Sequence, residues 1–131
     1  MKYLCLIYDD ESLWERMPKD EVDGIMGEFR SFTQDIKKSG HMAAGEQLQP
    51  TSTATTVRIR DGRTVMTDGP YAETKEQLGG FYLVEARDLN EAIQVAAKIP
   101  GARYGSIEVR PVIDFAAMEQ QQTGAQESAR A

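Results

Sequence analysis

The sequence is poor in the residues that soft-metal and redox sites need. Its 131 residues include one cysteine, one histidine and one tryptophan. A single Cys5 excludes an internal disulfide, which suits a reducing compartment. A single His41 excludes the HExxH motif and most histidine-rich zinc sites. No phosphate-cradling or dinucleotide motif is present either, so we expect neither a metal nor a cofactor.

Long apolar runs and an excess of cations are also missing. No stretch approaches the roughly 20 apolar residues of a membrane span. The apolar start lacks a small-residue cleavage site and runs into Asp9, which predicts a strand and not a signal peptide. Fifteen basic residues against 21 acidic ones give a net charge of −6, which disfavours nucleic acids and anionic membranes. We expect a cytoplasmic protein that binds neither.

The negative charge is confined to one segment. Residues 9–28 hold eight acidic and two basic residues, so this segment accounts for the whole net charge. Acidic side chains at the start of a helix interact favourably with its positive end, which is one explanation. A docking surface for a basic partner is the other.

Length and composition predict one domain with one core. The chain is 40% apolar and 27% charged, an ordinary globular balance. From residue 116 onward it is mostly alanine, glutamine, glutamate and serine. We therefore predict a domain over residues 1–115 and a mobile tail over residues 116–131.

Hydrophobic periodicity indicates alternating strands and helices. Residues 2–8 are apolar on both faces, as in a central strand. Apolar residues at three- and four-residue steps predict a helix from Pro18 to Gly40. Gly24 and Gly27 inside this helix are expected to allow close packing against a neighbour, and a ligand role is the alternative. A second helix begins at an Asp88 cap and stops before Pro100. Further strands are predicted at residues 42–48, 81–86 and 107–109.

A hairpin is predicted over residues 53–67, because Asp61-Gly62 separates two alternating runs. The order of elements then fits a ferredoxin-like α+β sandwich: an antiparallel sheet with two helices on one face and an inserted β-hairpin. The other face would expose Leu6 and Tyr8, and an apolar sheet face is normally covered. We expect self-pairing into a homodimer.

Asp68 is the candidate reactive residue. A two-residue loop pairs Thr55 with Asp68, which places Asp68 on the same face as Val57, Ile59 and Met66. A carboxylate facing an apolar cavity has a raised pKa and can act as an acid or base. The alternative is a turn role, because Asp before Gly-Pro commonly accepts backbone N–H bonds.

Residues 68–82, DGPYAETKEQLGGFY, resemble the signature of the DGPF branch of the YCII-related family, with Tyr71 where the motif has phenylalanine. The resemblance covers about residues 1–115. It implies a ferredoxin-like fold, a dimeric α/β barrel with two sheets face to face, and an unassigned activity. A His–Asp pair has been suggested as the active site in the wider group. His41 does not match its position, so Asp68 is the residue carried over.

These observations lead to two hypotheses. The first is a dimeric, cytoplasmic small-molecule-binding protein or cofactor-independent enzyme, with a site in the inter-sheet cleft. Asp68 would be catalytic there, and Tyr8, Tyr71 and Lys75 would bind the ligand. The second is a non-catalytic accessory protein linked to an extracytoplasmic-function sigma factor, as the family resemblance implies.

Overall fold

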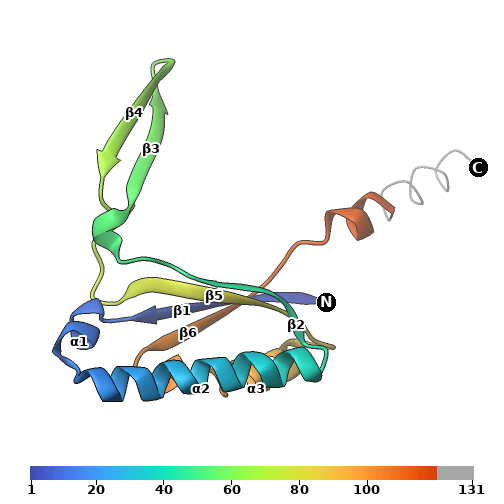
Figure 1. The fold of residues 1–131 in the computed structure, drawn as a ribbon. Helices are drawn as coiled ribbons and strands as arrows, with labels where there is room; N and C mark the ends of the chain where they lie inside the picture. The colour runs from blue at the N-terminus through green and yellow to red at the C-terminus, as the bar shows by residue number, and fades with distance from the viewer. Residues whose placement is uncertain (121–131) are drawn as a thin grey trace, which may run out of the picture.

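The computed structural model describes residues 1–120. Four antiparallel strands form one sheet in the order β2-β5-β1-β6, and two long helices cover one of its faces (Figure 1). This arrangement confirms the predicted ferredoxin-like α+β class. The strands are β1 (Lys2–Asp9), β2 (Met42–Gln47), β5 (Gln77–Glu85) and β6 (Ser106–Pro111), and the helices are α2 (Lys19–Lys38) and α3 (Leu89–Ala96).

The core lies between the sheet and the helices. Along β1, Tyr3, Cys5 and Ile7 are buried, whereas the alternate residues of the strand are only half-buried on the open face. The helices contribute Ile25, Phe32, Ile36, Ala92, Val95 and Ala96. The buried side chains therefore alternate along the central strand and recur every three to four residues along the helices. Together they form a single core.

Local capping chemistry sets the helix ends. The Asp88 side chain accepts a 2.9 Å bond from the backbone N–H of Glu91 at the start of α3. Gly40 takes a φ of 80° just after α2, a left-handed conformation that favours glycine. Pro18 precedes the first residue of α2 instead of occupying it. A short α1 (Glu11–Arg16) follows β1, with Asp10 as its N-cap.

The inserted hairpin is formed by β3 (Thr55–Arg60) and β4 (Arg63–Asp68). Asp61 and Gly62 have positive φ values of 52° and 73°, as a two-residue type I′ turn requires. The predicted register is confirmed: Thr55 pairs with Asp68, and Val57 pairs with Met66. The hairpin is a separate two-stranded sheet that rises from one end of the molecule, on the side opposite the helices (Figure 1).

The strand predicted at residues 81–86 begins four residues earlier, at Gln77. The prediction stopped short because Gly79 and Gly80 suggested a loop. In the structure Ile7 pairs with Gly80 and Tyr8 with Leu78, so Gly79 is the extra residue of a bulge. A Cβ on Gly80 would lie 2.8 Å from the Glu46 carbonyl oxygen. Gly79 thus forms a bulge, and Gly80 permits a close approach of the β2 backbone.

The close packing expected at Gly24 and Gly27 is not found. A Cβ on Gly24 would meet nothing within 4 Å, and one on Gly27 would meet only the end of the Arg30 side chain. Both glycines line an open groove of about 810 Å³ between α2 and α3. The expectation of close packing was wrong, because a glycine in a helix can also leave the space of a missing side chain open to solvent.

After β6 the chain leaves the sheet, and residues 115–120 form a helical turn away from the body (Figure 1). The rest of the predicted tail, residues 121–131, lies outside the described residues. Within residues 1–120, no helix has the length and apolar character to cross a bilayer.

Candidate functional site

The most unusual side chain in the described structure is the carboxylate of Asp9. It is the last residue of β1 and continues the buried series of Tyr3, Cys5 and Ile7. Only 7% of Asp9 is exposed, and it is the one buried charged residue among residues 1–120. Acidic residues are seldom buried so fully without a partner.

The partner is the indole of Trp14 on α1. Its Nε1 donates a 2.9 Å hydrogen bond to Oδ2 of Asp9. Burial raises the pKa of Asp9 above its ordinary value of 3.8, the Trp14 bond opposes that rise, and the nearby charges of Glu11, Glu76 and Asp10 add to it. The environment therefore favours the protonated acid more than water does.

Two glycines lie beside Asp9. A Cβ on Gly79, in the bulge of β5, would lie 3.6 Å from Oδ1 of Asp9. A Cβ on Gly105 would lie 2.0 Å from the carbonyl oxygen of Tyr8 and 3.0 Å from the Asp9 Cβ. Gly105 follows η2 (Pro100–Arg103), so its loop can pass this close to β1 only with glycine there. Gly105 therefore lets the loop after η2 pack directly against the end of β1 at Asp9.

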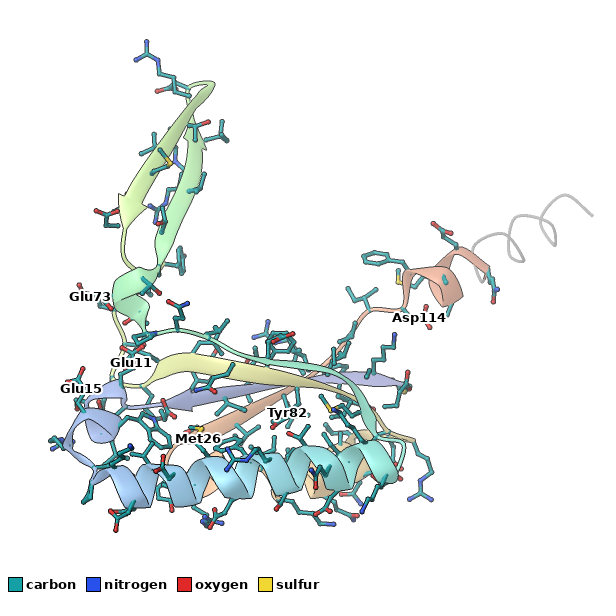
Figure 2. The ribbon with its side chains drawn as sticks, in the orientation of Figure 1. Glu11, Glu15, Met26, Glu73, Tyr82 and Asp114 are labelled. Atoms are coloured by element: carbon teal, nitrogen blue, oxygen red, sulfur yellow. The ribbon has the colours of Figure 1, made fainter. Side chains whose placement is uncertain are left out.

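A polar network ties the surrounding segments together. The Glu11 carboxylate accepts bonds of 2.8 and 2.7 Å from the backbone N–H and the hydroxyl of Thr51. Thr51 begins η1 (Thr51–Thr53), at the base of the hairpin. The Glu11 N–H donates to the side chain of Gln77, and the Ser106 hydroxyl donates to Glu76. Figure 2 shows Glu11 and Glu73 at the end of the sheet from which the hairpin rises.

We call the group formed by Asp9, Trp14, Glu76, Gly79 and Tyr104 the Asp9 site. The Tyr104 ring lies 6.4 Å from the Trp14 ring, centroid to centroid. A carboxylic acid with a raised pKa, held by a single neutral donor, keeps its proton to a higher pH than an exposed carboxylic acid does. The Asp9 site is therefore suited to general acid–base chemistry.

Asp68, the residue chosen from the sequence, lies elsewhere. It shares the hairpin face of Val57 and Met66, as the register predicted. That face is exposed in the chain, and so is Asp68, so no apolar cavity surrounds its carboxylate within one copy. The next residue, Gly69, has a φ of 107° and donates its N–H to Ala54 over 2.8 Å.

The structure does not gather the other three predicted residues into one cluster. Tyr71 is 83% exposed, with the Arg58 guanidinium 5.9 Å from its ring centroid. Lys75 is exposed, and its positive charge helps to lower the pKa of Asp10. Tyr8 is half-buried on the open face of the sheet, beside Leu78 and Ser106.

His41 takes part in a structural contact of its own. Its Nε2 lies 3.0 Å from Oε1 of Glu91, and its Nδ1 lies 2.7 Å from the Ser39 hydroxyl. The Glu91 carboxylate also pairs with Arg87 at 2.6 Å. The bond from His41 is the main cause of a lowered pKa at Glu91. His41 therefore fastens the loop after α2 to the start of α3, at the opposite end of β1 from Asp9.

Reasoning from the sequence missed Asp9 because it opens the acidic run Asp9-Asp10-Glu11. That run was interpreted only as part of the acidic segment of residues 9–28. A signal was present nonetheless: Asp9 stands two residues after Ile7, in phase with the buried face of a strand whose period is two. An acidic residue that continues a buried series is worth examining as a site.

The comparisons place the chain in a family. The YCII-related domain matches residues 1–116. A relative, the uncharacterized protein R00369 of Rhizobium meliloti (strain 1021), is 39% identical over 114 residues, which cover 86% of this chain and 92% of the relative. Because the domain match spans nearly the whole described structure, this chain belongs to the YCII-related family.

Proposed function

We propose that the protein binds a small molecule at the Asp9 end of its sheet and, as a cofactor-independent enzyme, transfers a proton through Asp9. The observation that carries this proposal is an acidic residue, Asp9, that is only 7% exposed, has a raised pKa and accepts one bond from Trp14. Burying an ionisable group costs stability, and such groups concentrate at functional sites. The reactions that fit are isomerisations or eliminations in which a proton leaves or joins a carbon atom.

The segment of residues 68–76 and Tyr8 of β1 supply the remaining groups of the proposal. Lys75, close enough to influence Asp10, would attract an anionic part of the ligand. Tyr8 and Tyr71 would contact its apolar part. Asp68 would orient the ligand or transfer a second proton. The pairing of two copies would bring its carboxylate to the cleft. The proposal also includes membership of the DGPF branch, supported by the resemblance of residues 68–82 to its signature, and a cytoplasmic location.

The proposed working unit is a homodimer. Four apolar side chains of the two central strands, Leu4, Leu6, Phe81 and Leu83, are half-buried on the open sheet face, where they pair across β1 and β5. An apolar sheet face is usually covered by another layer. A second copy would cover it, as in a dimeric α/β barrel, and would turn the open face into an inter-sheet cleft.

The test is a thermal-shift screen of small metabolites on the wild type and on the Asp9→Asn variant. The matched control is Glu15→Gln, which changes an exposed carboxylate of α1. A ligand at 100 times its Kd adds about 2.7 kcal/mol to the free energy of unfolding. We expect compounds that raise the Tm of the wild type and of Glu15→Gln but not of Asp9→Asn. Equal shifts in all three proteins would remove Asp9 from the site.

Asp68→Asn in the same screen separates the two carboxylates. If Asp68 orients the ligand, its variant loses most of the thermal shift while the pH dependence of binding, set by Asp9, is retained. If the shift is unchanged, Asp68 serves only the turn at the base of the hairpin.

The second candidate function is that of an accessory protein acting on an extracytoplasmic-function sigma factor. The observation that favours it is the set of exposed acidic residues near the start of α2: Asp20, Glu21 and Asp23. A basic partner helix would meet that charge. Titration with a purified sigma factor encoded nearby, at two salt concentrations, tests it, because binding through these residues weakens as salt increases.

A further inference from the structure

The β3–β4 hairpin exposes a row of apolar side chains that no part of the described chain covers. Val57 and Ile59 are each 59% exposed and Met66 is 70% exposed. The register puts all three on one face of the hairpin. Among residues 1–120, β3 and β4 contact each other far more than any other element.

Such a hairpin needs support from outside itself. A two-stranded hairpin is at best marginally stable in water, because it buries too little apolar surface to offset the entropy of ordering it. This one nevertheless has a full six-pair ladder from Thr55↔Asp68 to Arg60↔Arg63. An exposed row of apolar residues on a long hairpin is typical of an interaction surface.

The hairpin shares one side of the molecule with the two other uncovered apolar surfaces. It rises at one end of the open sheet face, and the chain after β6 rises at the other end (Figure 1). That C-terminal segment exposes Val112, Ile113, Phe115 and Met118. The open face lies between these two projections, so one body seated on the sheet can contact all three surfaces at once.

The length of the hairpin shows how far it reaches. Strands of six residues rising about 3.3 Å per residue extend roughly 20 Å. Two sheets packed face to face are only about 10 Å apart. A hairpin of this length therefore extends past a second sheet and reaches the helix layer behind it.

Charge selects the occupant. Arg58, Arg60 and Arg63 share the other face of the hairpin and its tip, whereas residues 9–28 carry the whole negative charge of the chain. A two-fold symmetric dimer has two such contacts, because each copy has both the basic hairpin and the acidic segment. The basic residues of each copy can then meet the acidic residues of the other.

We propose that the hairpin is a dimerisation arm: the face of Val57, Ile59 and Met66 packs against a second copy of this chain seated on the open sheet face. Each copy embraces the other, and at the tip of the arm Arg60 and Arg63, which flank the turn beyond the apolar row, reach the acidic segment of the partner copy. This inference rests on the homodimer of the proposed function and adds the element that holds it together.

The experiment compares two neighbouring positions on opposite faces of β4. Met66→Glu places a charge on the apolar face, and Thr67→Glu places the same charge on the other face. Sedimentation equilibrium gives the dimer Kd of both variants and of the wild type. We expect Met66→Glu to raise the Kd at least about tenfold, equivalent to about 1.4 kcal/mol, and Thr67→Glu to stay within about threefold of the wild type, under 0.7 kcal/mol.

Hydrogen exchange of the wild type provides a measurement that needs no variant. The amides of residues 55–68 should become more protected as the protein concentration passes through the dimer Kd. Rapid exchange of these amides in the dimer, or an unchanged Kd for Met66→Glu, overturns the arm while leaving the homodimer in place. A wild type that stays monomeric overturns both the arm and the homodimer. The ligand screen then tests the Asp9 site independently of dimerisation.

Discussion

Trp14 Nε1 lies 2.9 Å from Oδ2 of Asp9 and donates its hydrogen to a carboxylate with almost no contact with water. The bond joins the end of the central strand to the first short helix. It also opposes the rise in the Asp9 pKa that burial causes. The behaviour of this pair is the basis for most of the predictions below.

Trp14→Phe removes the N–H donor and keeps an aromatic ring at this position. We expect the free energy of unfolding at pH 7 to fall by about 1–3 kcal/mol, the cost of leaving a buried acceptor unpaired. In a double-mutant cycle with Asp9→Ala, which removes the acceptor, urea unfolding should give a coupling energy above about 0.5 kcal/mol. Additive effects of the two substitutions would show that the bond contributes nothing.

Asp9→Asn should stabilise the fold at neutral pH. A raised pKa means that the folded state holds the proton more tightly than the unfolded state. Stability due to this group is therefore present at acid pH and is lost as the pH rises through the folded pKa. The asparagine variant escapes that loss, so its Tm should exceed that of the wild type at pH 7 and match it below the ordinary pKa of 3.8. A lower Tm at pH 7 would contradict the direction of the shift.

Two alanine substitutions should have effects of opposite sign. Gly105→Ala puts a Cβ 2.0 Å from the Tyr8 carbonyl oxygen, which forces the loop away from β1 and costs at least about 1–3 kcal/mol. Gly24→Ala adds a Cβ to a helix where nothing lies within 4 Å and should gain up to about 1 kcal/mol. Urea denaturation of both variants measures this. A destabilised Gly24→Ala would indicate that this groove is occupied in solution.

The thiol of Cys5 should be unreactive toward thiol reagents in the folded protein. The residue is fully buried, and burial raises the pKa of its thiol to about 11, so at pH 8 about one thiol in a thousand is ionised. We expect a thiol reagent to label it at the rate of global unfolding and to label the urea-unfolded chain at once. Fast labelling without urea would indicate that β1 opens locally.

Much of this fold could be predicted because local chemistry and periodicity agreed. Asp61-Gly62 determined the hairpin turn, and the turn determined every pair in its ladder. The buried side of β1 followed from Tyr3, Cys5 and Ile7. Gln77 and Leu78 were missed as strand residues because two glycines followed them, and only the pairing with Tyr8 and Asp9 shows that the strand continues through a bulge.

The site was harder to predict than the fold. Asp68 was placed on the correct hairpin face, but sequence periodicity cannot tell whether that face is covered. The phase of Asp9 with Ile7 was its one local signal, and the Trp14 donor and the two neighbouring glycines were found only in the structure. Each of them comes from a different part of the chain, so no local pattern could connect them.

The central claim is that Asp9 is held ready to exchange a proton. Its most direct test is an NMR titration of the side-chain carboxyl carbons in the folded protein, with Asp10 as the internal reference. Burial predicts a midpoint for Asp9 above 3.8, whereas the bonds from Ser12 lower the pKa of Asp10 below that value. An Asp9 midpoint at or below that of Asp10 would contradict the account.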